Sequence, residues 1–284
     1  MAGSETFFPA RDYDLAATLD SGQAFRWRPD GDAWIGIVGK HWLRLRARSD
    51  GIAAETAWPA HDWSWLANYL QTGVELSLIL ATFPDDEPMR DAAIACHGLR
   101  LLRQEPWECL ASFILSSTKQ ILQIRQIVAL LCERFGEPVA APPPYAPVFA
   151  FPSPERLARA TEAELRACKM GFRAPYLLAA ARVVAEGRLD LNRLNQLPQE
   201  IARGELMQLP GVGRKIADCV LLFACGFQTA FPVDVWVMKA LRQLYFPRRR
   251  VTPKRLQRFS ETYFGPNAGY AQQYLFHYMR TKLK

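Results

Sequence analysis

The chain lacks several features that would assign it to common protein classes. It has no apolar stretch of the roughly 18 residues that a membrane span requires. Its first residues contain no basic segment followed by an apolar core, as a secretory signal would. We therefore expect an intracellular protein without a membrane partner, in the cytoplasm or nucleoid, or in the nucleus of a eukaryotic cell. With 284 residues, half of them hydrophobic, the chain can bury a sizeable core.

Paired cysteines are also missing. The six cysteines form no Cys-x-x-Cys pair and no array with the four histidines, so the sequence offers no set of zinc ligands. We expect reduced thiols in helices and no metal site. The cysteines are Cys96, Cys109, Cys132, Cys168, Cys219 and Cys225.

Acidic residues are scarce near the C-terminal end. The chain has a net charge of +7, but residues 239–284 hold eleven Lys or Arg and one acidic residue, Glu261, so this segment alone contributes +10 (11 − 1). Such clustering favours a polyanionic partner, because phosphate contacts release counterions where cations gather. A solvated face or a targeting signal would give the same pattern.

Two kinds of periodicity divide the chain. Residues 23–57 alternate apolar and polar side chains between turn signals, which predicts an antiparallel meander. After residue 59 the apolar spacing becomes three and four, which predicts helices. We expect an α+β, mostly α fold, with an N-terminal antiparallel domain over residues 1–86 and a helical domain over 87–284. The helical spacing covers 63–70, 107–134, 173–186, 198–208, 214–224 and 267–283.

A proline-rich segment interrupts the helical part. Residues 138–154 contain seven of the twenty prolines, which excludes regular helix or a central strand there. We interpret this segment as a linker between two helical lobes, with a cleft between the lobes that could hold the polyanionic partner.

The most informative motif lies in the C-terminal third. Residues 209–213 read Leu-Pro-Gly-Val-Gly between two helical patterns, which predicts a helix, a tight hairpin and a second helix. Backbone N–H groups at such a turn bind phosphate. Lys215 falls on the first turn of the second helix, and Asp234 follows nineteen residues later. An amine can displace a base from its sugar and leave an imine, and a carboxylate can stabilise the cationic sugar. The plainer alternatives are a phosphate-contacting lysine and an aspartate that caps a helix beginning at Val235.

These residues resemble the helix-hairpin-helix superfamily of DNA glycosylases and, within it, the 8-oxoguanine DNA glycosylase/lyase family. The resemblance covers nearly the whole chain. It extends beyond the hairpin to residues 21–27, 101–110, 116–117, 171–176 and 265–276.

The resemblance implies a pocket for a base flipped out of duplex DNA that contains oxidised guanine. Gly22 would offer its carbonyl to the N7 hydrogen of 8-oxoguanine, and Gln272 would address the Watson–Crick edge. Cys219 and Phe276 would stack on the two faces of the base. A turn, a surface glutamine and core packing are the alternative roles. Phosphate or duplex contacts would come from Gly211, Val212, Gly213, Trp236, Phe172 and Arg173.

Several positions depart from the family pattern. Thr118 stands where the family has an asparagine that fills the gap left by the flipped base. Gln123 stands where an arginine often contacts the opposite cytosine. Trp236 replaces a histidine that contacts a phosphate, whereas Lys119 is an additional cation. We therefore predict a weaker dependence on cytosine opposite the lesion, or a somewhat different spectrum of lesions.

The leading hypothesis is an 8-oxoguanine glycosylase that cleaves the abasic strand by β-elimination. A monofunctional alkyl-base glycosylase and a non-catalytic DNA-binding protein are the alternatives. The resemblance implies no required cofactor, a possible monovalent cation at the hairpin, and no iron–sulfur cluster, because the four-cysteine loop of a sister branch is missing. We expect a monomer.

Overall fold

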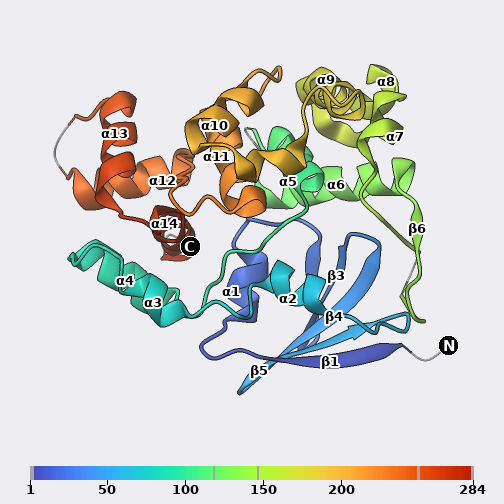
Figure 1. Ribbon diagram of the computed structural model, residues 1–284, viewed down its shortest axis with the longest axis horizontal. Coiled ribbons are helices and arrows are strands. Elements are labelled where there is room, and N and C mark those ends of the chain that lie inside the picture. The colour runs from blue at the N-terminus through green and yellow to red at the C-terminus, as the bar shows by residue number, and fades with distance from the viewer. Residues whose placement is uncertain (1–2, 118, 146, 248–249, 283–284) are drawn as a thin grey trace.

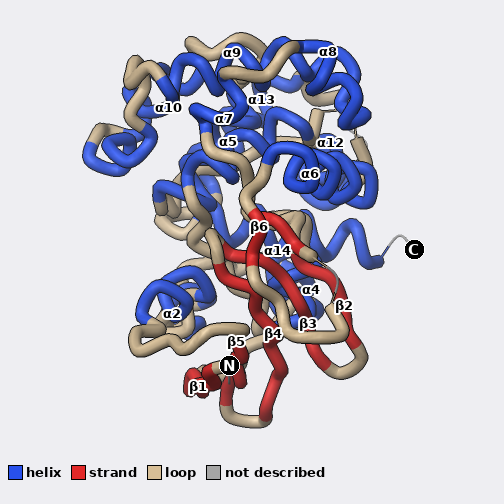
Figure 2. Tube along the Cα trace, turned by 90° about the vertical axis from the view of Figure 1, so that its right-hand side faces the viewer, coloured by secondary structure: helices blue, strands red, loops and turns tan. Residues whose placement is uncertain are grey.

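A computed structural model describes residues 3–117, 119–145, 147–247 and 250–282 of the chain. A five-stranded antiparallel sheet lies at one end and a helical body at the other (Figures 1 and 2). The predicted α+β, mostly helical fold is confirmed. The strands are β1 (Ser4–Pro9), β2 (Trp27–Asp30), β3 (Ala33–Val38), β4 (His41–Arg48), β5 (Gly51–Thr56), β6 (Pro138–Val139) and β7 (Val148–Phe149).

Most of the described chain beyond the sheet is helical. The helices are α1 (Leu15–Asp20), α2 (Ser64–Leu70), α3 (Leu76–Leu80), α4 (Glu87–Ala95), α5 (Pro106–Leu115), α6 (Ile121–Phe135), α7 (Pro154–Ala158), α8 (Glu162–Leu165), α9 (Ala174–Ala185), α10 (Gln199–Met207), α11 (Arg214–Val220), α12 (Val235–Ala240), α13 (Pro253–Tyr263) and α14 (Ala268–Lys282). Wider π-helical turns extend α11 and α12 over Leu221–Cys225 and Leu241–Tyr245, whereas the segment after α8, Arg166–Met170, contains a kink with non-helical backbone at Cys168 and Lys169. Tighter 3-10 turns cover Gly171–Arg173 and Leu191–Gln196.

The sheet has the strand order β1-β5-β4-β3-β2. The predicted meander is confirmed as β2 to β5, which pair in sequence order. Strand β1 joins the far edge by pairing Ser4 with Thr56 and Pro9 with Gly51. The prediction missed this strand because its sequence, Ser-Glu-Thr-Phe-Phe-Pro, does not alternate apolar and polar residues.

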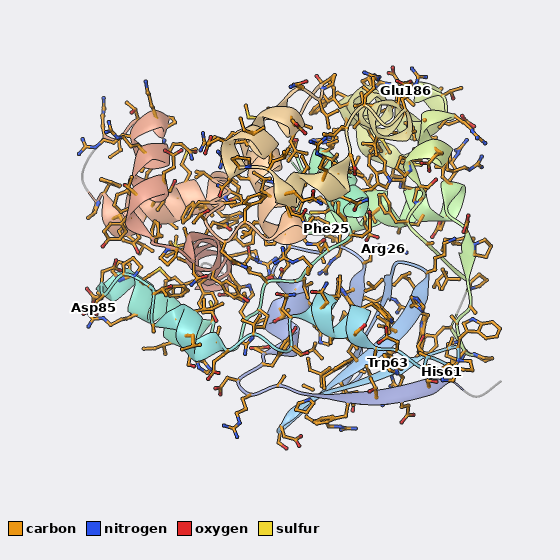
Figure 3. All side chains as sticks on the ribbon, in the orientation of Figure 1. Phe25, Arg26, His61, Trp63, Asp85 and Glu186 are labelled. Carbon is orange, nitrogen blue, oxygen red and sulfur yellow. The ribbon has the colours of Figure 1, made fainter. Side chains whose placement is uncertain are left out.

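Helices α1 and α2 supply apolar side chains to the inner face of the sheet. The buried indole of Trp27 donates a hydrogen bond from Nε1 to Tyr69 Oη at 2.8 Å, which ties β2 to α2. A second and larger core fills the helical body from α4 to α14. Phe25 belongs to that core and lies where the loop before β2 faces the helices (Figure 3).

The helical pattern over residues 107–134 is interrupted in the structure. Helix α5 ends at Leu115 and α6 begins at Ile121, so the segment between them forms a loop. Buried side chains continue on both sides of this break, which is why the apolar spacing alone did not reveal it. The loop matters because it faces the helix-hairpin-helix.

The proline-rich segment packs against the sheet. Strands β6 and β7 pair with each other. The Tyr145 ring centre lies 5.0 Å from that of Trp42, with the ring planes tilted by 44°, and Tyr145 Oη donates a hydrogen bond to Asp30 Oδ2 at 2.8 Å. Helix α7 then begins at Pro154, where a proline is tolerated because the first helical turn needs no N–H donor. This packing fixes where the chain re-enters the helical body.

Candidate active site

A cavity of about 760 Å³ lies where the loop before β2 meets the helical body. Its walls come from that loop, the end of α5, the start of α6, α11, the segment before α12, and α14. Eight of the residues predicted for the site line it: Gly22, Lys119, Lys215, Cys219, Asp234, Trp236, Gln272 and Phe276. Segments more than 200 residues apart in sequence therefore share one cavity.

Lys215 reaches across the cavity from α11 to the end of α5. Its Nζ donates a hydrogen bond to Ser116 Oγ at 3.1 Å and lies 5.0 Å from the ring centre of Phe113. The Ser116 hydroxyl donates in turn to Phe113 O at 2.7 Å, so its lone pairs are available to the lysine. These contacts hold the amine at the cavity wall.

Asp234 occupies the turn that leads into α12. Its Oδ1 accepts the Val237 N–H at 2.8 Å, and the predicted helix start at Val235 is confirmed. Burial raises the pKa of this carboxyl, whereas the Val237 N–H and the charge of Lys215 oppose that rise. The cap fixes the carboxylate in the same cavity as the amine.

The loop that carries Gly22 is fixed by the fully buried Gln23. The Gln23 Nε2 donates to Thr18 O at 2.9 Å and to Arg100 O at 2.8 Å, and its Oε1 accepts the Leu102 N–H at 2.8 Å. The Gln104 Nε2 donates to Gln23 O at 2.7 Å. Because both the side chain and the backbone carbonyl of Gln23 are hydrogen-bonded, the loop is rigid and can hold a neighbouring carbonyl in a fixed direction.

Gly22 has a backbone conformation that suits glycine. Its φ is +77°, and an added Cβ would lie 2.7 Å from Ile121 Cδ1 and 3.5 Å from Phe276 Cε1. A larger residue would therefore be strained and would intrude on α6 at the cavity wall.

Helix α14 secures the same loop from the C-terminal end of the chain. Gln273 Nε2 donates to Ser21 O at 3.0 Å, and Arg280 donates to Asp20 O. The Asp20 carboxylate also accepts from Arg125 Nη2 at 2.7 Å. Two cations thus fix the residue that ends α1.

Gln272 is buried with unused hydrogen-bonding capacity. The residue is 4% exposed, it lines the cavity, and its Oε1 accepts no hydrogen bond from the described residues. A buried acceptor without a donor is costly, so this oxygen fits a ligand that brings its own N–H group.

Cys219 and Phe276 contribute the apolar part of the cavity. Cys219 is 3% exposed, and burial raises the pKa of its thiol to about 12, so the group is neutral at physiological pH. It therefore offers a small apolar surface. Phe113, Phe25 and Phe223 add aromatic surface that the sequence did not reveal, because apolar residues in a predicted helix or strand are interpreted simply as core.

The predicted hairpin connects α10 and α11. Gly211 has a φ of +78°, and an added Cβ would lie 2.5 Å from the Tyr176 ring. Gly211 and Gly213 are exposed, whereas Val212 is 5% exposed and its N–H donates to Leu209 O at 3.0 Å. The two glycines thus form the outer surface of the turn, and Val212 anchors it.

A buried ion pair joins the two helices behind the hairpin. Arg203 Nε on α10 donates to Asp218 Oδ1 on α11 at 2.6 Å, and both side chains are about 95% buried or more. Arg214 Nε lies 3.6 Å from the other carboxylate oxygen. This pair sets the position of α11, and therefore of Lys215.

Phe172 and Arg173 are neighbours in the sequence but differ in exposure. Phe172 is 53% exposed, as a residue that wedges into a duplex must be. Arg173 is 2% exposed and donates hydrogen bonds to Ser117 O and, at 3.2 Å, to Met170 O. In this arrangement Arg173 supports the loop after α5, and its guanidinium is not on the surface.

Three of the four residues that depart from the family pattern lie in the part of the chain that the structure describes. Thr118 lies outside the described residues. Lys119 lines the cavity. The Gln123 Oε1 accepts the Gln120 N–H at 3.2 Å and so caps the start of α6. Trp236 also lines the cavity, and Lys239 Nζ lies 5.6 Å from its ring centre, so a cation accompanies the indole.

The sequence reasoning missed the residues that position the site. Ser116, Gln23, Gln273 and Arg280 act through long-range contacts, and such contacts leave no local pattern. Gln23, Ser116 and Gln273 lie in segments that resemble the family, but no individual role for them follows from the sequence. Across the part of the chain that the structure describes, no group of three or more His, Cys, Asp or Glu side chains could hold a metal ion. No helix in that same part is long and apolar enough to cross a membrane.

Comparisons with known proteins agree with this geometry. Residues 6–110 match the family described as 8-oxoguanine DNA glycosylase, N-terminal domain, and residues 111–266 match the HhH-GPD superfamily base excision DNA repair protein family. The chain is 30% identical to the N-glycosylase/DNA lyase OGG1 of Arabidopsis thaliana, over 96% of this chain and 80% of that protein.

Solved structures are similar over the full length. The structure of MBOgg1 in complex with a low-affinity DNA ligand has a TM-score of 0.94 and 32% identity, covering 100% of this chain and 98% of that one. The 8-oxoguanine glycosylase/lyase of Clostridium acetobutylicum, solved with duplex DNA containing cytosine opposite 8-oxoguanine, has a TM-score of 0.90 and 28% identity, with full coverage of both chains.

The hairpin, the lysine and the capped aspartate around one cavity define a helix-hairpin-helix DNA glycosylase of base excision repair. Within that class, the chain belongs to the 8-oxoguanine DNA glycosylase family.

Proposed function

We propose that this protein removes 8-oxoguanine from duplex DNA and cleaves the resulting abasic strand through an imine at Lys215. The observation that carries the proposal is the position of Lys215 Nζ in a cavity with the capped Asp234 and the unpaired acceptor of Gln272. The cavity is large enough for a flipped nucleotide, which must leave the duplex to react.

The reaction uses the residues as follows. The neutral amine of Lys215 attacks the sugar C1′, the new N–C1′ bond forms, and the bond from C1′ to the base breaks. The base leaves with the electron pair and takes up a proton. The carboxylate of Asp234 stabilises positive charge on the sugar as the base departs.

Strand cleavage follows from the intermediate. Opening of the sugar ring gives an imine between Nζ and C1′, which acidifies the C2′ proton. Removal of that proton forms a double bond and expels the 3′ phosphate, so the strand breaks by β-elimination. This chemistry requires no resident cofactor. A monovalent cation at the hairpin carbonyls would assist phosphate binding only.

Borohydride trapping tests the lysine mechanism. Incubation with a duplex containing 8-oxoguanine should yield a covalent complex, because borohydride reduces the imine. Lys215→Gln should abolish the complex and the strand break. Lys119→Gln, which removes the other lysine of the same cavity, should leave both in place. Trapping by Lys215→Gln, or no base release by the unaltered protein, would overturn the proposal and favour the alkyl-base or non-catalytic alternatives.

We further propose that the protein depends weakly on cytosine opposite the lesion. Gln123 uses its Oε1 to cap α6 and has no guanidinium, and the guanidinium of Arg173 is buried, so neither residue offers an exposed arginine side chain to an opposite base. Base release should proceed at similar rates opposite each of the four bases. Gln123→Arg should increase the preference for cytosine, since a bidentate pair contributes about 1–3 kcal/mol of discrimination. A strong cytosine preference in the unaltered protein would contradict this proposal.

A further inference from the structure

Helix α13 and the residues before it carry exposed positive charge that the proposed chemistry does not use. The side chains of Arg242, Arg250, Lys254, Arg255 and Arg258 are all exposed. Among the ion pairs formed within the described residues, none involves these five cations. Their charge is therefore available to an external partner.

The geometry of α13 aligns two of these cations with the hairpin. Lys254, Arg258 and Glu261 are spaced by four and three residues, so they lie along one side of the helix. Glu261 Oε1 accepts from Arg214 Nη2 at 2.5 Å, and Arg214 is the first residue of α11, adjacent to Lys215. The side of α13 that bears Lys254 and Arg258 is therefore joined, through the Glu261–Arg214 ion pair, to the first residue of the hairpin helix α11.

The helix is rigidly supported from beneath. Leu256 and Ser260 are fully buried on the opposite side, and Tyr263 Oη donates to Asp86 Oδ2 at 2.8 Å. Tyr245 Oη donates to Asp86 Oδ1 at 3.3 Å, which connects the aromatic residues under α13 to the cap of α4. Nitrogen-tipped side chains project outward from the α13 end of the molecule (Figure 3).

We infer that Lys254 and Arg258 form a second phosphate-binding surface, which contacts the DNA backbone on one flank of the lesion. The rise of 1.5 Å per residue places Lys254 about 10 Å along the helix from Glu261. One strand presents a phosphate every 3.4 Å along the duplex axis, so this distance extends the contact by roughly three base pairs. This inference rests on the proposed function for the orientation of the duplex.

Other partners fit this surface less well. A membrane-binding helix combines basic residues with a broad exposed apolar face. On α13, which the structure describes in full, Tyr263 is the only large apolar residue that is exposed, at 40%. The charge and the continuity with the hairpin favour DNA over a lipid surface.

The test compares two double variants of the full chain with equal changes in charge. Lys254→Gln/Arg258→Gln removes the proposed contacts. Arg28→Gln/Arg48→Gln removes two exposed cations from the sheet domain instead. Binding to a duplex is measured over a range of salt concentrations. The α13 variant should reduce the slope of log K against log salt by about 1.8, because each lost phosphate contact contributes about 0.9. The sheet variant should keep the slope of the unaltered protein.

A second arm uses duplexes that extend on only one side of the lesion. The α13 variant should lose affinity for duplexes extended on one particular side and bind those extended on the other side normally. An unchanged slope, or an equal loss with both variants, would overturn the inference. Borohydride trapping at saturating protein should be unaffected in both variants. If the unaltered protein fails to trap, the proposed function fails, while the salt slopes still decide whether α13 binds DNA.

Discussion

At the scale of single residues, most polar groups of the site are hydrogen-bonded, whereas one buried acceptor has no hydrogen-bond donor among the described residues. Gln273 donates to a backbone carbonyl, whereas its neighbour Gln272 buries an amide oxygen without a donor. Burial of such an oxygen costs about 1–3 kcal/mol in the free protein. The cost is consistent with an acceptor kept ready for a base that supplies an N–H.

This contrast gives a paired prediction. Gln272→Met removes the unpaired oxygen while keeping the length of the side chain, so the free energy of unfolding should rise by about 1 kcal/mol. Excision of 8-oxoguanine should weaken in the same variant. Gln273→Met should instead lower the free energy of unfolding by about 1–2 kcal/mol, because Ser21 O loses its donor. Denaturant unfolding measures both, and destabilisation by Gln272→Met would contradict the argument.

The sequence could identify residues whose identity matters chemically. Lys215 and Asp234 stand at a recognisable motif, and the structure brings both to one cavity. Ser116 and Gln23 were not identified, since a serine that accepts from a lysine 99 residues away has no local signature. Long-range hydrogen bonds are a property of the fold, and a single sequence does not display them.

At the scale of elements, the helix-hairpin-helix is positioned by contacts on its inner side. The Arg203–Asp218 pair joins α10 to α11, and the Tyr176 ring of α9 packs against Gly211. The exposed glycine backbone on the outer side is then free to approach DNA. A tight turn with a fixed base is what a phosphate-binding hairpin requires.

Two glycines of this hairpin should respond differently to alanine. Gly211→Ala should lower the free energy of unfolding by about 2 kcal/mol or more, because its φ is positive and the added Cβ meets a rigid ring. Gly213→Ala should change it by less than about 0.5 kcal/mol, since its φ is −92° and no atom lies within 4 Å of the added Cβ. Thermal unfolding of the two variants checks this. Equal destabilisation would show that the turn is not fixed by Tyr176.

At the scale of the whole molecule, periodicity predicted which regions are sheet and which are helix, but not how they meet. The meander and the long helices follow from patterns of two and of three to four residues. The short helices α3, α7 and α8 have too few residues to show a period, and the strand β1 does not alternate apolar and polar residues. The packing of the proline-rich segment on the sheet depends on Tyr145 and Trp42, which are far apart in sequence.

The cavity is lined by residues that lie about 250 positions apart in the sequence, so they are synthesised at different times. The Gly22 loop is made about 250 residues before Gln272, Gln273 and Arg280 on α14. Chains grow from the N-terminus, so a partly made or prematurely terminated chain can carry the hairpin and Lys215 but lacks a complete pocket. Such a fragment would have Lys215 without the residues that complete the cavity, so under the proposed function only a chain extended through α14 would remove a base.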